Sequence, residues 1–115
     1  MKSYNGFTPQ QREASIPILK KAIAEGRIKD PMQDKCCICG QDKGIRHLHN
    51  EDYSPDKVVE DAHCVCWRCH MMIHGRFRHP NSFAKYMIDV TIYKKQFPPV
   101  YRPTDWGALN INLID

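Results

Sequence analysis

Apolar and polar residues follow a helical spacing near both ends of the chain, and the first helix has recognisable boundaries. The hydroxyl of Thr8 stands directly before a proline and three residues before Gln11, which is typical of a helix start closed by a capping box. Gly26 is expected to end this helix. Pro17 interrupts the pattern, so the sequence predicts either a kinked helix or a short helix followed by a second one over residues 18–25.

The middle of the chain has the pattern of short strands and turns. Residues 42–44 are predicted to form a hairpin turn that leads into a strand over residues 45–49. A polar loop is expected over residues 50–57. The apolar pair Val58 and Val59 is then interpreted as the start of a second short strand or a loop.

Two further helices are expected in the second half of the chain. One is predicted from residue 67 to about residue 77, ended near a His-Pro pair. The other is predicted over residues 83–97, where apolar residues follow a helical period, with Asn81 or Ser82 as its cap and two prolines after it. The tail beyond residue 98, which contains Trp106, is expected to pack back on the domain or onto a second copy.

Length and composition limit the class of protein. A chain of 115 residues is expected to form one domain over residues 1–115. No apolar run suits a signal peptide or a membrane span, so we expect no membrane partner and a cytoplasmic location in which thiols stay reduced. The net charge of +4 is compatible with a phosphate-rich partner but does not establish one.

Six cysteines carry the strongest chemical signal in the sequence. Four of them form two Cys-x-x-Cys pairs, which predict a tetrahedral structural zinc site: Cys36, Cys39, Cys66 and Cys69. Cys37 could replace Cys36 only through a less usual Cys-x-Cys chelate, and Cys64 is also out of frame, so both are interpreted as small buried apolar residues. Disulfides would require an oxidising compartment. Because such a zinc site can contribute roughly 10–16 kcal/mol to folding, the apo form should be poorly folded.

Histidines adjacent to these cysteines indicate a second metal site. His70 and His74 are four residues apart and would share one face of a helix. His47 and His49 would share one face of a strand. A hairpin clamped by zinc to the start of the helix would bring His49 near His70 and His74. Imidazole-rich and oxygen-rich sites suit Mg²⁺, Mn²⁺ or Zn²⁺.

A family resemblance covers residues 36–74 and rests on three strings: C-x-x-C-G, H-L-H-N-E-D-Y-S and D-A-H-C-V-C-W-R-C-H-M-M-I-H. Together they resemble the HNH (ββα-metal, His-Me finger) endonuclease family in its zinc-knuckled phage and bacterial form. The resemblance implies an α+β protein with a small ββα-metal fold and a four-cysteine zinc site, flanked by N-terminal and C-terminal helices. The helical lead-in would span residues 8–30, the core residues 34–78, and the C-terminal helix and tail residues 81–115.

The resemblance also implies roles for individual residues. His49 matches a metal-ligand position, His70 the second ligand, and His74 a further helix histidine that binds the metal or the scissile phosphate. Asp61 matches the middle asparagine of the family, which steadies the loop or the catalytic imidazole. The general-base position holds Asn50, and an amide cannot take a proton from water at neutral pH.

Three alternatives for the base stay open at this point. His49 could be the base, with His47 or a carboxylate as the ligand. Tyr53, His47 or His63 could take the role from another direction. The domain could also bind nucleic acid without cleaving it.

The function implied by the resemblance is a DNA endonuclease or nickase with a structural Zn²⁺ and a catalytic Mg²⁺ or Mn²⁺. A Mg²⁺ ion would call for a carboxylate or several waters, and Glu51 and Asp52 are the candidates. Four basic side chains are predicted to bind DNA phosphates, with a solvated face as the alternative: Arg68, Arg76, Arg78 and Lys85.

The expected partner is DNA, bound with low sequence specificity, and the setting is a bacterial cell or a phage. A homodimer or a larger phage or bacterial complex is a further alternative. A protein-binding zinc domain with no nucleic-acid role is the third hypothesis, but it leaves His49, His70 and His74 unexplained.

Overall fold

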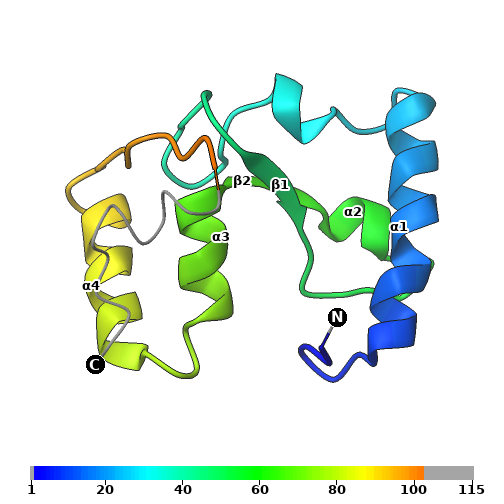
Figure 1. Cartoon of the computed structure of the whole chain (residues 1–115), viewed down its shortest axis with the longest axis horizontal. Coiled ribbons are helices and arrows are strands. Elements are labelled where there is room, and N and C mark those ends of the chain that lie inside the picture. The colour runs from blue at the N-terminus through cyan, green and yellow to red at the C-terminus, as the bar shows by residue number, and fades with distance from the viewer. Residues whose placement is uncertain (1, 103–115) are drawn as a thin grey trace. The chain divides into compact units, whose positions relative to one another are not determined.

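The computed structural model describes residues 2–102, in which four α-helices, one short 3₁₀ helix (Pro31–Gln33) and a two-stranded sheet occur (Figure 1). The predicted α+β class is confirmed, whereas the finer ββα-metal fold stays a prediction. The tail around Trp106, which was expected to pack back, lies outside the described residues. No helix within residues 2–102 has the length and apolar character needed to cross a bilayer.

The described chain divides into two compact units, and each is best considered by itself. The first unit contains residues 2–30 and 48–63. The second unit contains residues 31–47 and 64–102.

The first unit is built on α1 (Pro9–Ala24), whose two ends form as the sequence predicts. The Thr8 hydroxyl accepts from the Gln11 N–H at 3.2 Å, and the Gln11 side chain accepts from the Thr8 N–H at 2.8 Å. At the other end Gly26 takes a φ of +76°, and its N–H and that of Arg27 donate to the Ile23 and Ala22 carbonyls of the helix. Pro17 lies inside this one helix, so the alternative of two short helices is excluded. A single proline removes only one bond of the ladder.

A short helix, α2 (Val58–Asp61), packs against α1 in the same unit (Figure 1). The expectation of a strand or loop at Val58 and Val59 was therefore wrong. Val58 is fully buried, its N–H donates to the Ser54 carbonyl, and its own carbonyl accepts from the Asn50 side chain. Burial and these hydrogen bonds outweigh the modest strand preference of a β-branched pair.

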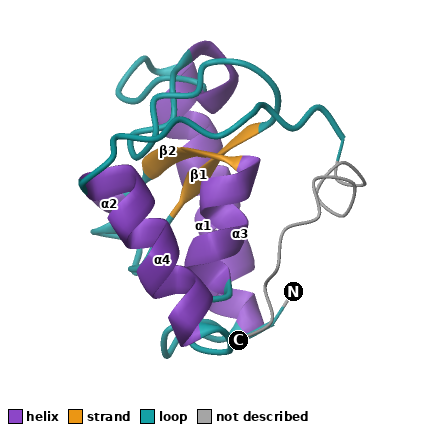
Figure 2. Ribbon diagram, turned by 90° about the vertical axis from the view of Figure 1, so that its left-hand side faces the viewer, coloured by secondary structure: helices purple, strands orange, loops and turns teal. Residues whose placement is uncertain are grey.

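The sheet pairs β1 (Arg46–His49) with β2 (His63–Cys66), as Figure 2 shows in orange. The predicted strand over residues 45–49 is thus confirmed to within one residue. Just beyond the strand ends, the Trp67 N–H donates to the Ile45 carbonyl at 3.1 Å. The start of β1 therefore lies opposite the end of β2, which makes the pair antiparallel.

Two helices complete the second unit and lie side by side in Figure 1. The first, α3 (Trp67–His74), begins where predicted but ends earlier, because Gly75 forms its C-cap. The second, α4 (Pro80–Thr91), begins earlier than predicted, because Pro80 takes the first helical position and His79 the cap position. It also ends well before the two prolines that were expected to stop it.

The core of the second unit consists of these buried residues: Cys36, Val65, Cys66, Cys69, Met72, Tyr86, Val90 and Phe97. The Tyr86 and Phe97 rings stack with their centroids 5.7 Å apart. Three of the buried residues are cysteines from the two predicted zinc pairs. The hydrophobic core and the predicted zinc site are therefore the same region of the unit.

Candidate metal centres

Four cysteine sulfur atoms of the second unit lie within 4.8 Å of one another: those of Cys36, Cys39, Cys66 and Cys69. Cys39 Sγ and Cys66 Sγ are 3.7 Å apart. Sulfur atoms bound tetrahedrally to one zinc at about 2.3 Å are themselves about 3.8 Å apart. The cluster is therefore close enough to bind a metal ion such as zinc. All six cysteines are free thiols in this structure.

Each Cys-x-x-Cys pair forms the same backbone turn around its first sulfur. The Cys39 N–H donates to Cys36 Sγ, and the Cys69 N–H donates to Cys66 Sγ, both at 3.5 Å. Cys66 is at the same time the N-cap of α3. Gly40, with a φ of +81°, closes the first turn. Amide N–H groups directed at sulfur stabilise its thiolate form, which is the form that binds zinc.

Close packing of the four thiols lowers the pKa of some of them and raises the pKa of others. Hydrogen bonds with Cys39, Cys66 and Cys69 lower the pKa of Cys36, whereas hydrogen bonds with Cys36 and Cys39 raise the pKa of Cys69. Four sulfur atoms at this separation cannot all be thiolates without a compensating cation, because like charges oppose ionisation. A divalent ion at their centre would supply that positive charge.

The two remaining cysteines hold the first cysteine turn against β2. The Cys37 N–H donates to the Cys64 carbonyl at 2.8 Å. Cys64 is buried, and burial raises the pKa of its thiol to about 11. Cys37 is exposed rather than buried, so the interpretation of both as buried apolar residues holds only for Cys64.

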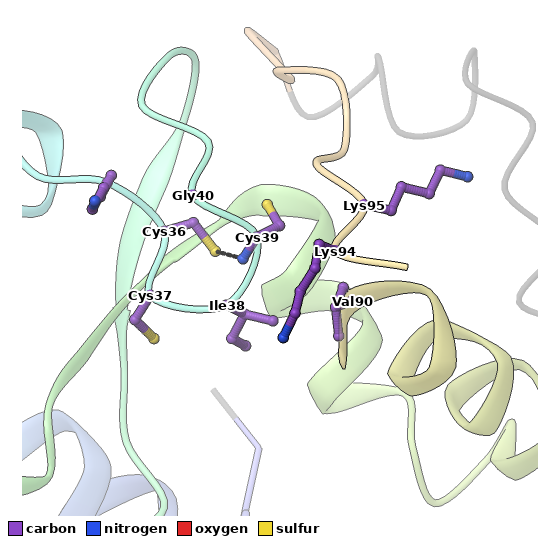
Figure 3. Close-up of a pocket in the computed structure, with 9 residues that line it drawn as sticks. Cys36, Cys37, Ile38, Cys39, Gly40, Val90, Lys94 and Lys95 are labelled. Atoms are coloured by element: carbon purple, nitrogen blue, oxygen red, sulfur yellow. Dashed lines mark hydrogen bonds between the residues drawn. The ribbon is translucent and has the colours of Figure 1, made fainter. Parts of the chain in front are cut away.

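Three lysines border the outer side of the first cysteine turn, where Lys94 and Lys95 can be followed in Figure 3. With Lys35 and the turn itself they line a cavity of about 320 Å³. The sequence gives no sign of this arrangement, because Lys35 is distant from the other two along the chain.

The four predicted DNA-binding side chains differ in their surroundings. Arg68 is half-buried, with its guanidinium carbon 4.1 Å from the centroid of the Phe97 ring, and burial lowers its pKa. Arg76 is partly buried and stacks on a neighbouring aromatic ring at 4.4 Å. Arg78 and Lys85 are exposed. Arg68 thus packs within the unit, and the two exposed residues are the better candidates for phosphate contacts.

Three histidines of the second unit form a chain of contacts. His70 Nε2 and His74 Nε2 are 2.9 Å apart, and His70 Nδ1 is 3.1 Å from His47 Nδ1. Nitrogen atoms bound to one ion at about 2.0–2.1 Å lie about 2.9–3.4 Å apart, depending on the coordination geometry. The pair His70 and His74 therefore has the spacing of two ligands to one ion. Burial lowers the pKa of His47, whose ring meets Trp67 edge-on.

His49 lies in the first unit, where a carboxylate contacts its ring. His49 Nε2 is 2.5 Å from Glu51 Oε2, and the Tyr4 hydroxyl donates to the same oxygen at 2.5 Å. A carboxylate accepts hydrogen bonds, so His49 Nε2 carries the proton that is shared with Glu51 in this contact. Sequence analysis offered Glu51 only as a metal ligand, and its contact with Tyr4 across the unit had no signal in the sequence.

Asn50 and Asp61 hold the loop that follows β1. Asn50 is 2% exposed, and its side-chain N–H donates to the Val58 carbonyl at 2.8 Å. One Asp61 carboxylate oxygen accepts from the backbone N–H groups of Glu51 and Asp52 at 2.7 and 2.8 Å. Both side chains therefore fix the loop to α2.

The other side chains considered as a base have different surroundings. The Tyr53 ring packs against the rings of Phe7 and Tyr4, and the Arg12 guanidinium lies over it. His63 is exposed at the start of β2. Neither residue has a described contact with an imidazole or a carboxylate that would tune it as a base.

Comparison of the chain with protein-family models, with curated proteins and with solved structures finds no match. The chemistry of the two centres therefore has to be inferred from their own residues. The second unit contains the four cysteines and, separately, His47, His70 and His74. The first unit contains His49, Asn50 and Asp61.

Proposed function

We propose that the protein is a divalent-metal-dependent DNA endonuclease or nickase of the HNH type. The cysteine cluster would hold a structural zinc, and the histidines of α3 would hold the catalytic ion. One observation carries this proposal: a helix that opens with two zinc-type cysteines continues with two imidazoles whose Nε2 atoms are 2.9 Å apart. This arrangement supports the proposal, because His70 directly follows Cys69 and His74 is four residues further along the same helix.

The residues of the chain suit hydrolysis of a phosphodiester. A bound divalent ion would stabilise the negative charge of the transition state and of the leaving oxygen. His70 and His74 would bind that ion through Nε2. His49, whose Nε2 contacts Glu51, stays the candidate general base. Exposed Arg78 would contact the DNA backbone.

A second candidate function is nucleic-acid binding without cleavage. The position at which the resemblance expects a catalytic base holds Asn50, which is buried and hydrogen-bonded to the Val58 carbonyl. An amide with this role cannot activate water. If no other residue supplies the base, the metal centre would position the phosphate backbone without hydrolysing it.

Nicking of supercoiled plasmid tests the two candidates. Zinc-loaded protein would be incubated with plasmid in Mg²⁺, Mn²⁺ or EDTA, beside His70→Ala and His74→Ala. An endonuclease would convert the plasmid to the open-circular form in Mn²⁺ or Mg²⁺ only, and both variants would lose that activity.

Binding of the same plasmid would be measured by gel shift in parallel. Binding without conversion in either metal would contradict the endonuclease and support the second candidate. Absence of both binding and conversion by the folded, zinc-loaded protein at low salt would contradict both.

A further inference from the structure

The imidazole of His70 has a partner at each of its two ring nitrogens. Its Nε2 is 2.9 Å from His74 Nε2, on the next turn of α3. Its Nδ1 is 3.1 Å from His47 Nδ1, on β1. The His47 and His70 rings meet edge-on, with centroids 5.2 Å apart and planes at 84°. The ring is thus held from the helix on one side and from the sheet on the other.

Metal binding at His70 would fix where its proton resides. A neutral imidazole has one N–H, so a ring that gives its Nε2 lone pair to a metal ion carries the proton on Nδ1. That N–H needs an acceptor in the plane of the ring, because a half-buried donor without one loses a hydrogen bond. His47 Nδ1 lies at the distance such an acceptor requires.

We propose that His47 is a positioning residue for the metal ion bound by α3. Its Nδ1 accepts the Nδ1–H of His70, which selects the tautomer of His70 that has its lone pair on Nε2 and directs that atom to the ion. This inference rests on the proposed function, because it presumes the ion. Neither the family resemblance nor the spacing of the motifs assigns this role to His47.

The surroundings of His47 suit this role. Its ring packs edge-on against the Trp67 ring, with centroids 5.5 Å apart, so the indole limits rotation of the imidazole. Trp67 is the first residue of α3 and therefore moves with His70. Outer partners that orient a ligating histidine in this way contribute about 10–100-fold to metal affinity.

The first experiment reads the tautomers directly. Long-range ¹H–¹⁵N NMR spectra of the histidine rings would be recorded on wild-type protein with zinc in the cysteine cluster and one further equivalent of Zn²⁺. We expect His70 to carry its proton on Nδ1 and His47 to carry its proton on Nε2. A His70 ring protonated on Nε2, or a His47 ring protonated on Nδ1, would overturn the proposal.

The second experiment compares two substitutions of His47. In His47→Asn the side-chain oxygen stands near the position of Nδ1 and keeps an acceptor, whereas His47→Leu keeps bulk without one. Mn²⁺, which competes poorly for thiolates, would be titrated into zinc-loaded protein and followed by the loss of its free EPR signal. We expect Mn²⁺ to bind about 10–100-fold more weakly to His47→Leu, and His47→Asn to recover most of that loss.

The outcomes separate this inference from the function on which it rests. Wild-type protein that binds Mn²⁺ no better than His70→Ala would contradict the proposed metal centre. Wild-type protein that binds Mn²⁺, together with an unchanged affinity in His47→Leu, would overturn the role of His47 alone. Equal losses in His47→Leu and His47→Asn would also overturn it, since they would indicate packing rather than a hydrogen bond.

Discussion

The cysteine cluster and the histidine pair of the second unit share α3 but differ in their surroundings. Cys36, Cys66 and Cys69 are at most 3% exposed and belong to the hydrophobic core. His70 and His74 are half-buried and lie outside that core. Four ligands close a structural zinc site, whereas a catalytic ion keeps positions for water or substrate. Under the proposed function, this difference in burial suits a stabilising role for the cysteine cluster and a catalytic role for the histidine pair.

Removing a ligand from the cysteine cluster should produce the largest effect. For Cys69→Ser we expect loss of most of the zinc-dependent stability, on the order of the roughly 10–16 kcal/mol that such sites contribute. The reason is that Cys69 would be one of the four zinc ligands and is also a fully buried core residue. Thermal unfolding followed by circular dichroism should lose its cooperative transition.

Cys37→Ser is the matched control, because Cys37 is adjacent in sequence to a ligand but exposed. Its free energy of unfolding should change by no more than about 0.5 kcal/mol. Equal stability losses in both variants would contradict the assignment of ligands.

Removing a ligand from the histidine pair should affect chemistry and leave the fold intact. His70→Ala is expected to reduce metal-dependent nicking at least about 100-fold, since losing a ligand should cost more than losing an outer partner. The melting temperature should change little, because His70 lies outside the core. A plasmid assay and a thermal melt of the same preparation measure both quantities.

His79→Gln provides the control for loss of an imidazole, because His79 makes no side-chain capping bond. It should retain nicking and stability. If His70→Ala unfolded as readily as Cys69→Ser, the contrast between the two centres would be lost.

Sequence reasoning succeeded where a local pattern determines the structure. The Thr8 capping box, the Gly26 stop, the strand before residue 50 and the start of α3 all depend on neighbouring residues. The cysteine cluster was also predictable, because zinc demands a fixed spacing within each pair and closes the longer gap itself. These features need little knowledge of the rest of the fold.

The predictions failed where contacts with residues distant in the sequence determine the local structure. Val58 is helical because Asn50 and Ser54 hold its backbone and burial fixes its side chain. The guanidinium of Arg68 stacks on Phe97, which lies far along the sequence, and its contact with phosphate stays a prediction. No local pattern records such contacts, so propensity and charge alone pointed elsewhere.

Substitution of Asn50, a buried polar residue outside both clusters, tests whether the different effects on stability and nicking are specific to the cysteine cluster and the histidine pair. For Asn50→His we expect a loss of about 1–3 kcal/mol in the free energy of unfolding, because the buried Val58 carbonyl loses its donor and the larger ring must fit a closed site. Nicking should not rise, since the position is structural. Chemical denaturation and the plasmid assay give both values, and Asn81→Ala, on the exposed start of α4, serves as control. A gain in nicking would show instead that this position can hold a base.

The smallest expected effect is on the salt dependence of DNA binding, which should differ between variants of two arginines of the second unit. Arg78→Ala should lower the slope of log affinity for DNA against log salt by about 1, because an exposed guanidinium can neutralise one phosphate. Arg68→Met should leave that slope unchanged and cost about 1 kcal/mol of stability, because its cation stacks on Phe97. Fluorescence anisotropy at several salt concentrations measures the slope. A lower slope for Arg68→Met would indicate that Arg68 also contacts a DNA phosphate.

Because one helix begins at the cysteine cluster and continues into the histidines, metal ions would occupy the two proposed centres in a set order. The Nε2 atoms of His70 and His74 keep their spacing only while α3 is wound, and an eight-residue helix does not stay wound without tertiary support. Under the proposed function, zinc in the cysteine cluster would therefore be a prerequisite for the second ion, and the second ion would not be a prerequisite for zinc. Activity at the histidines would then depend on the supply of zinc. The zinc-free protein would be inactive even at high concentrations of magnesium or manganese.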